Sequence, residues 1–267
     1  MNPKPSYDTL ILEGGSLRCA FTAGVMDALL LLGPLKFERI FGISAGSMVM
    51  ATYLSGQYKH FYRISRDLVE DGTFIRFSSA WSKEGVMNLS HLKAHVMRHA
   101  PLDLDTLGIA QKSTQAIVVT THLETGEPRY MEPQGRDWMD ALVASSSLPM
   151  VTRGKVKFRG EWMFDGGYSD PLPLDKALEM GGRRILVVRT RPMGDHASQS
   201  YIDSFGMYWH RHNKVLAPLF LEGYERYNNT VDRLLLGGDN HGRTWEEIAP
   251  PYPLQTDALT VGAKEVA

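Results

Sequence analysis

The chain has few cysteines, no long apolar run and no excess of basic residues, and each of these absences excludes a class of protein. Its 267 residues include one cysteine, Cys19, so no intrachain disulfide can form. The longest apolar runs, such as Ala28–Leu32 and Val215–Leu221, are far shorter than the roughly 20 residues of a membrane span. Lys and Arg number 29 against 30 Asp and Glu, so there is no basic excess to hold a phosphate backbone. We therefore expect neither a disulfide framework, nor a membrane span, nor nucleic acid as a partner.

The segment Met1–Asp8 also lacks the apolar stretch of a signal peptide, and we find no internal repeat or low-complexity tract. With 43% hydrophobic residues, the chain is long enough for one large single-core domain or two small ones. We expect a soluble cytoplasmic protein, and a peripheral association with membranes through transient surface contact remains open. The sequence does not indicate an oligomeric state.

Short apolar runs alternate with longer helical patterns, which is typical of α/β proteins. Thr9–Leu12 is predicted to be a strand that ends at a glycine turn and is followed by a helix over Ala20–Leu32. Phe37–Ile43 repeats this scheme and leads into a helix that ends near Leu54. The first 55 residues thus predict two strand-to-helix turns.

The rest of the chain continues the alternation as far as Arg189. Residues 57–110 look mostly helical, and helices are also predicted at Asp137–Ser145 and Leu174–Met180. The predicted strands are Ala116–Thr121, its hairpin partner Pro128–Met131 around the Thr125-Gly126 turn, two short strands in Lys155–Phe164, and Arg184–Arg189. We expect the sheet to end there.

A long amphipathic pattern runs from Phe205 to Leu236, with apolar residues every three or four positions. Pro218 predicts a kink in this helix. Core packing is the simplest role for its apolar face, and a lid or wall for an apolar substrate is the alternative.

The second strand-to-helix turn contains a Gly-x-Ser-x-Gly motif. A serine on such a sharp turn has little room beside it, so the residues two positions away must lack side chains. Gly42 and Gly46 flank Ser44 in this way. Since the turn opens a helix, the helix N-terminus faces any negative charge that develops at the serine. Ser44 is therefore the candidate nucleophile.

Two further motifs fit the same chemistry. Adjacent glycines, as at Gly14 and Gly15, let successive N–H groups point into one concavity that can hold an oxyanion. This turn lacks the Gly-x-Gly-x-x-Gly spacing of a dinucleotide site, and a purely structural turn remains an alternative. Asp165, followed by Gly166 and Gly167, is a carboxylate at a strand end that could take the serine proton directly; alternatively, it only caps its own turn.

In this order, over about residues 9–190, the three motifs resemble those of the patatin-like phospholipase family. The segment from Ala144 to Pro149 also looks like the one that precedes the family's aspartate region. The resemblance implies a three-layer α/β/α fold with a mainly parallel central sheet, a catalytic domain over residues 1–200, and a helical C-terminal extension over 201–267 packed on it. It also implies a lipid acyl hydrolase of the phospholipase A or carboxylesterase type, with a lipid or other acyl ester as substrate and no cofactor.

The resemblance assigns roles to individual residues. Ser44 and Asp165 correspond to the family's catalytic Ser-Asp dyad, and Gly14, Gly15 and Ser16 correspond to its oxyanion loop. Arg18 stands at the family's basic position, either orienting the loop by bonding carbonyls or attracting an anionic head group. Gly42, Gly46, Gly166 and Gly167 support the two turns. Ser16 and Cys19 replace glycines of the family pattern, and we expect Cys19 to be a small buried side chain.

Two other functions remain open at this point. His196 follows the aspartate in the Ser-Asp-His order of α/β-hydrolases, which would give the same serine a histidine base. A catalytically weak lipid-binding or regulatory module is the other alternative. His91, His95 and His99 share one helix face, but three ligands spread over about 12 Å cannot surround one ion, so we expect no metal.

Overall fold

The structure, a computed structural model, describes residues 6–72, 74, 86–149, 151–152, 156–198, 208 and 211–254. Within these residues, eight strands form one sheet in the order β5-β6-β3-β2-β1-β7-β8, with β4 paired to β3. The strands are β1 Thr9–Leu12, β2 Arg39–Ile43, β3 Gln115–His122, β4 Pro128–Met131, β5 Val156–Phe158, β6 Glu161–Asp165, β7 Arg184–Val188 and β8 Thr244–Ile248. The central run from β3 to β8 is parallel, whereas β4 and β6 each pair antiparallel with β3 and β5 pairs antiparallel with β6.

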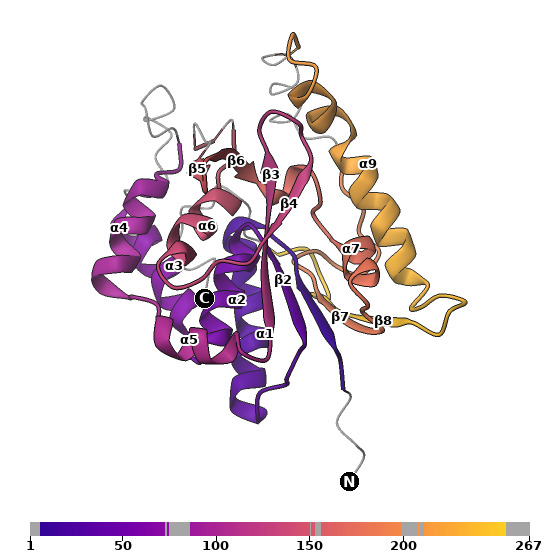
Figure 1. Cartoon of the computed structure of the whole chain (residues 1–267), viewed down its shortest axis with the longest axis horizontal. Helices are drawn as coiled ribbons and strands as arrows, with labels where there is room; N and C mark the ends of the chain where they lie inside the picture. Colours follow the sequence, from indigo (N-terminus) through magenta and orange to yellow (C-terminus); the bar gives the residue numbers. More distant parts are fainter. Residues whose placement is uncertain are drawn as a thin grey trace.

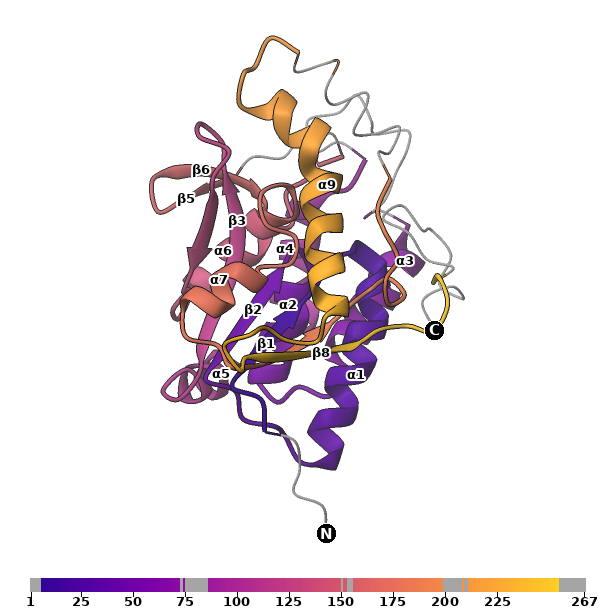
Figure 2. The ribbon, with the colours of Figure 1, turned by 90° about the vertical axis from the view of Figure 1, so that its right-hand side faces the viewer.

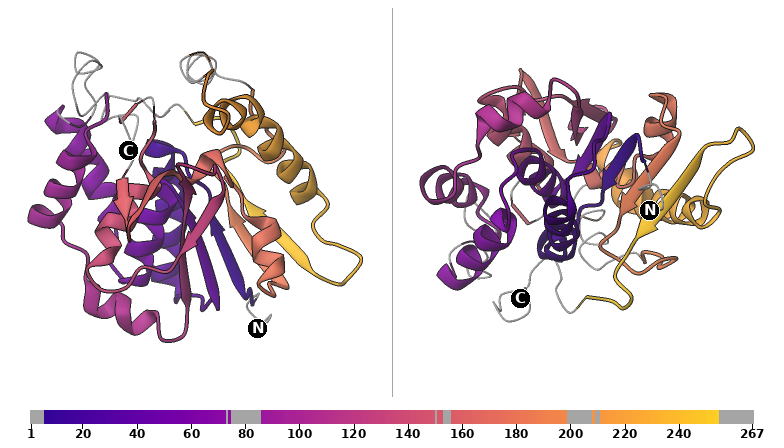
Figure 3. Two further views of the ribbon diagram at one scale, coloured as in Figure 1. Left: turned by 45° about the horizontal axis from the view of Figure 1, so that its top comes forward. Right: turned by 90° about the horizontal axis from the view of Figure 1, so that it is seen from below.

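Helices cover both faces of this sheet (Figure 1). They are α1 Cys19–Leu32, α2 Ala45–Leu54, α3 His60–Asp71, α4 Leu89–His99, α5 Leu104–Ala110, α6 Asp137–Ser145, α7 Leu174–Glu179 and α9 Leu216–Leu235, with short 3-10 turns η1 Ser16–Arg18 and η3 Gly166–Tyr168. One face carries α1, α2, α5 and α6, and the other carries α7 and α9, as Figure 3 shows from two directions. The predicted three-layer α/β/α fold with a mainly parallel sheet is confirmed.

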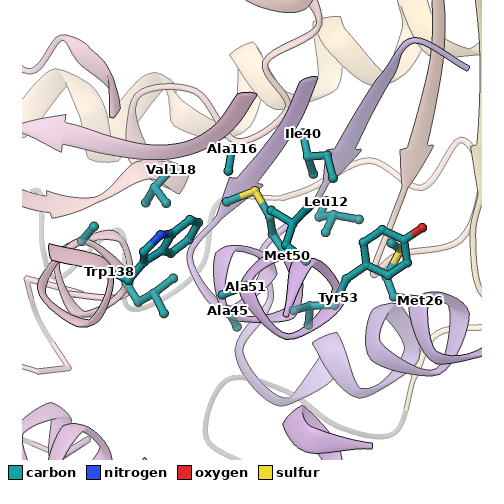
Figure 4. Packing of buried hydrophobic residues seen from close by; sticks show 14 of the residues in the cluster. Leu12, Met26, Ile40, Ala45, Met50, Ala51, Tyr53, Ala116, Val118 and Trp138 are labelled. Atoms are coloured by element: carbon teal, nitrogen blue, oxygen red, sulfur yellow. The ribbon is translucent and has the colours of Figure 1, made fainter. Parts of the chain in front are cut away.

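The two cores follow from the alternation of side chains along buried strands. In β1, Leu10 and Leu12 face the core under α1 and α2, whereas Ile11 faces the core under α7 and α9. Figure 4 shows the first core, in which Met50 of α2 and Trp138 of α6 pack near strand residues. Both faces of β1 are buried, which is why Leu10, Ile11 and Leu12 follow one another as a continuous apolar run.

The sheet does not end at β7, so that prediction is wrong. Thr244–Ile248 forms β8, which pairs in parallel with β7 from Arg184↔Thr244 to Val188↔Ile248. Residues 201–267 therefore contribute a strand as well as a helix. The division at residue 200 stays a prediction, although β8 belongs to the same sheet as β1.

The long C-terminal helix is shorter than its sequence pattern predicted, and Pro218 does not interrupt it. The helix α9 begins at Leu216, so Pro218 lies in the first turn, where a backbone N–H has no helical acceptor to lose. Most of the predicted stretch from 205 to 210 lies outside the described residues. Figure 2 shows α9 lying across the sheet beside α7. Among the described residues, no helix is both long and apolar enough to cross a bilayer.

Candidate active site

Ser44 occupies a strained turn between β2 and α2. Its backbone φ of 52° and ψ of −129° are rare for a residue with a side chain. A Cβ on Gly42 would lie 2.5 Å from Cα of Ser47, and one on Gly46 would lie 2.4 Å from the carbonyl oxygen of Leu12. Both positions therefore require glycine, which is the physical basis of the motif. Because α2 starts at the next residue, its N-terminus faces the serine.

Asp165 lies at the end of β6, and its carboxylate meets the serine. The hydroxyl of Ser44 donates a 2.6 Å hydrogen bond to Oδ2 of Asp165, across 121 residues of sequence. The other carboxylate oxygen, Oδ1, accepts the N–H of Gly167 at 2.8 Å. Only 3% of Asp165 is exposed. The two oxygens thus have separate functions: one is held by the turn, and the other faces the hydroxyl.

The environment of Asp165 sets its acidity. Burial raises the pKa of this carboxyl to about 6, while the hydrogen bonds from Ser44 and Gly167 act in the opposite direction. At neutral pH the group is mostly ionised, yet it binds a proton far more readily than an exposed aspartate. Such a carboxylate is suited to accepting a proton from a hydroxyl.

The loop that bears Asp165 is fixed to β3. A Cβ on Gly166 would lie 2.3 Å from the carbonyl oxygen of Val119, so the backbone there approaches the strand too closely for any side chain. Thr121 of β3 donates a 2.7 Å hydrogen bond from its hydroxyl to the carbonyl oxygen of Asp165. The position of the carboxylate is therefore determined by the sheet.

The glycine loop after β1 packs against the serine turn. A Cβ on Gly14 would lie 2.9 Å from the carbonyl oxygen of Ile43 and 3.0 Å from Cβ of Ser44. In the described part of the chain, the amides of Gly14 and Gly15 have no hydrogen-bond acceptor. Gly15 has a φ of 152° and Ser16 a φ of 52°, the region that favours glycine. Ser16 thus keeps a glycine-like backbone despite its side chain.

Ser145 is a further residue of the candidate site, and the sequence interpretation did not assign it. Its hydroxyl accepts the backbone N–H of Ser44 at 2.8 Å and donates to the carbonyl oxygen of Val119 at 2.6 Å. This fully buried hydroxyl, at the end of α6, joins the serine turn to β3. Its only signal in the sequence was its place in the Ala144–Pro149 segment.

A buried charge network lies behind the glycine loop. The carboxylate of Glu13 accepts the N–H of Thr190 at 2.6 Å and the hydroxyl of Tyr227 at 2.7 Å. Arg189, fully buried at the end of β7, donates to the Tyr227 hydroxyl at 2.6 Å and to Glu247 of β8 at 3.1 Å. The network holds Glu13, which precedes Gly14, from α9 and from the residues that follow β7, and Arg189 connects it to β8. The signal for this network in the sequence was Arg189, a charged residue directly after the apolar strand β7.

Ser44 and Asp165 open into a cleft of about 1100 Å³. One side is the glycine loop, and the other is formed by α9 through Leu219, Phe220 and Tyr224. The core-packing role expected for α9 is confirmed by buried residues such as Val231, whereas its role as a wall for an apolar substrate stays a prediction. No histidine is among the described residues that line the cleft.

Arg18 lines this cleft without orienting the loop through carbonyls. No hydrogen bond or ion pair joins its guanidinium to the described residues, and its Nε is buried without a partner.

Cys19 is fully buried, and its thiol donates to the carbonyl oxygen of Glu13 at 3.5 Å. Burial also raises the pKa of Cys19, so this thiol is an inert packing group.

The remaining histidines lie elsewhere. His196 is half-exposed and contacts Asp232 of α9 at 2.8 Å through Nε2. On α4, His91 contacts Asp71 at 2.8 Å, and the ring centroids of His95 and His99 lie 4.9 Å apart with the rings tilted by 42°. No group of three or more potential metal ligands occurs within the described ranges.

Fold and site together define an α/β protein with a serine turn over a buried aspartate and a glycine loop beside both. The family described as "Patatin-like phospholipase" matches residues 10–178, well over half of the chain. The chain therefore belongs to the patatin-like phospholipase family, whose name denotes enzymes that act on lipid esters. This family membership confirms the resemblance drawn from the motifs.

Two relatives extend the comparison. The chain is 26% identical over 271 aligned positions to the uncharacterized protein YjjU of Escherichia coli (strain K12), covering 96% of this chain and 72% of that protein. The crystal structure of VipD from Legionella pneumophila aligns with 98% of this chain and 66% of its own length, at 12% identity and a TM-score of 0.40. That likeness is too remote to bear on the site.

Proposed function

We propose that this protein is a serine lipid acyl hydrolase, of the phospholipase A or carboxylesterase type, in which Ser44 and Asp165 form the catalytic dyad. The observation that carries the proposal is the 2.6 Å hydrogen bond from the Ser44 hydroxyl to a buried carboxylate whose pKa is raised to about 6. An aspartate so placed needs no histidine between itself and the serine.

In the first half of the reaction, Oγ of Ser44 attacks the ester carbonyl carbon while its proton moves to Oδ2 of Asp165. The amides of Gly14 and Gly15 donate to the resulting oxyanion, and such donors typically contribute about 2.7 to 4 kcal/mol each. When the tetrahedral intermediate collapses, the bond to the leaving alkoxide breaks. The alkoxide takes the proton from Asp165 and leaves as an alcohol, while the acyl group stays on Ser44.

In the second half, water replaces the alcohol. Asp165 accepts a proton from the water molecule as the water oxygen attacks the acyl carbon, and the same amides hold the second oxyanion. Collapse of this intermediate releases the fatty acid and returns the proton to Oγ of Ser44. No step requires a metal or an organic cofactor.

The triad alternative has less support. The ring of His196 is engaged by Asp232 at the surface rather than by Asp165, and the Ser44 hydroxyl is already bonded to a carboxylate. A triad needs the base within hydrogen-bond reach of the hydroxyl. His196 therefore serves as the comparison residue in the test below.

The test compares hydrolysis of p-nitrophenyl butyrate by the wild type and three variants. Ser44→Ala and Asp165→Asn should each lower kcat/KM by at least about a thousandfold, because members of one catalytic unit fail together. His196→Ala should retain the wild-type rate. Full activity in Asp165→Asn with loss in His196→Ala would establish the triad instead. Equal rates in all four proteins would indicate a lipid-binding module without catalysis.

A further inference from the structure

A second cavity meets the site at Ser44 and shares Ser16 and Leu148 with the cleft. It has an empty volume of about 520 Å³ and lies among α2, α3 and α4. Ser44 lines both this cavity and the cleft. The nucleophile therefore stands where two differently shaped spaces join.

The two spaces differ in chemistry. Among the described residues that line the cavity none is charged, and its wall consists largely of side chains such as Leu17, Phe61 and Leu68. The cleft, in contrast, contains Arg18 and Arg191 together with acidic groups. An ester with an apolar chain on one side and a polar leaving group on the other fits this asymmetry in one orientation only.

One of the serine hydroxyls that line the cavity, that of Ser146, is suited to an ester. Ser146 is only 8% exposed, and its Oγ has no hydrogen-bond partner within the described part of the chain. A buried hydroxyl without a partner is costly unless a ligand supplies one. Its place on the cavity lining beside Ser44 is where the oxygens of a bound ester would lie.

An adjoining chamber of about 360 Å³ shares part of the lining of the cavity. Four side chains line both spaces, namely Met48, Phe61, Ile64 and Leu92. They come from α2, α3 and α4, and together they form a partition between cavity and chamber. His60 lines the chamber, and its Nδ1 is buried without a described partner.

We propose that the acyl chain of the substrate occupies the apolar cavity, that its leaving group occupies the cleft, and that the partition sets the longest chain accepted. This inference rests on the proposed hydrolase function and names the substrate class: esters of medium-length acyl chains that end at the partition. In this proposal, longer chains are excluded because the four side chains that line both spaces separate the cavity from the adjoining chamber.

The activity test removes one side chain of the partition. Leu92→Ala should join the cavity to the chamber and raise kcat/KM for p-nitrophenyl palmitate, relative to p-nitrophenyl butyrate, by about tenfold or more, since each accommodated methylene is worth about that factor. Leu107→Ala is the matched control, because Leu107 is a buried leucine of α5 that lines neither space. The control should keep the wild-type ratio of palmitate to butyrate.

A binding test does not depend on turnover. In a Ser44→Ala background, isothermal titration with palmitate below its micellar concentration should show about tenfold tighter binding when Leu92→Ala is added. Octanoate binding should change much less, and Leu107→Ala should alter neither affinity. Thermal unfolding of each variant verifies that the comparison is between folded proteins.

The outcomes separate this inference from the proposed function. Ser44-dependent hydrolysis with an unchanged palmitate ratio in Leu92→Ala would overturn the chain site and leave the hydrolase intact. Absent hydrolysis with tighter palmitate binding in Leu92→Ala would overturn the hydrolase and retain the chain site. If neither rate nor affinity responds to Leu92→Ala, the cavity does not hold the chain.

Discussion

Tyr227 of α9 donates a 2.7 Å hydrogen bond to Glu13, the residue at which β1 passes into the glycine loop. The same hydroxyl accepts a hydrogen bond from Arg189, so it stands between a buried anion and a buried cation. Tyr227 and Glu13 are separated by 214 positions in the sequence. A helix near the C-terminus of the described chain thus helps to position the loop that is expected to stabilise the oxyanion.

Tyr227→Phe should therefore lower both stability and activity. Removing the hydroxyl leaves Glu13 and Arg189 each without one partner, which costs about 1 to 3 kcal/mol of unfolding free energy. Loss of position in the glycine loop should lower kcat more than it raises KM. Urea unfolding and steady-state kinetics measure the two effects.

Tyr53→Phe provides the control. Tyr53 lies on α2 away from the site, is as buried as Tyr227, and donates a hydrogen bond from its hydroxyl to the carbonyl oxygen of Leu35. This variant should lose comparable stability while keeping the wild-type kcat. If both variants lose kcat to the same extent, the network is a general stabiliser with no bearing on the loop.

Ser145→Ala should release the strained backbone of Ser44. The Ser145 hydroxyl accepts the amide of Ser44, so its loss leaves that buried N–H unpaired and lets the φ of 52° relax. We expect kcat to fall about tenfold or more, since a small displacement of a nucleophile is costly. Ser55→Ala, which removes a buried serine hydroxyl at the far end of α2, should leave kcat unchanged. An unchanged kcat in Ser145→Ala would mean that the glycines alone hold the turn.

Asp165 should make activity depend on pH. Only the ionised carboxylate can accept the serine proton, and burial raises its pKa to about 6. The wild-type kcat/KM should therefore rise as pH increases through about 6 and level off above it. A profile whose inflection lies near that of an unperturbed aspartate would show that the carboxylate is not desolvated during catalysis.

The raised pKa of Asp165 also makes the stability of the fold depend on pH. The pKa of Asp165 is raised from 3.8 in the unfolded chain to about 6 in the folded protein, so the folded protein binds this proton more tightly. Protonated Asp165 therefore contributes stability at low pH, and this contribution is lost as the pH rises through about 6. Above this pH range, the raised pKa corresponds to a loss of about 3 kcal/mol in the free energy of unfolding. Asp165→Asn should thus be more stable than the wild type at about pH 8 and no more stable at about pH 4. Urea unfolding at both values tests this; equal stabilities at about pH 8 would contradict it.

The sequence predicted the fold best where local signals agree. Apolar runs that end in glycine turns located β1 and β2, and α6 was placed with its bounds at Asp137 and Ser145. The strand β8 was missed because it alternates Trp245, which is buried, with exposed and acidic residues. One of those, Glu247, is buried only because Arg189 pairs with it. An edge strand stabilised by a long-range ion pair has no local apolar signature.

At the candidate site, sequence motifs could locate those residues that the backbone geometry of a turn requires to be glycine. Gly42, Gly46 and Gly166 each lie where a Cβ would meet backbone atoms within 2.5 Å, so their spacing identified the turns. The contacts that hold those turns come from distant residues: Ser145 lies 101 positions from Ser44. The identity of such partners depends on how α6 and α9 pack, which no local pattern encodes.

Arg18 provides the last prediction, because its guanidinium lines the cleft without a partner in the described residues. A cation at the leaving-group side should favour anionic head groups. Arg18→Gln should therefore lower hydrolysis of phosphatidylglycerol vesicles several-fold more than hydrolysis of phosphatidylcholine vesicles, and added salt should narrow the wild-type difference. Arg98→Gln, which removes an exposed arginine of α4 outside the cleft, should affect both lipids equally. Equal losses on both lipids in Arg18→Gln would assign Arg18 to the shape of the loop, since a structural role does not distinguish the charge of the leaving group.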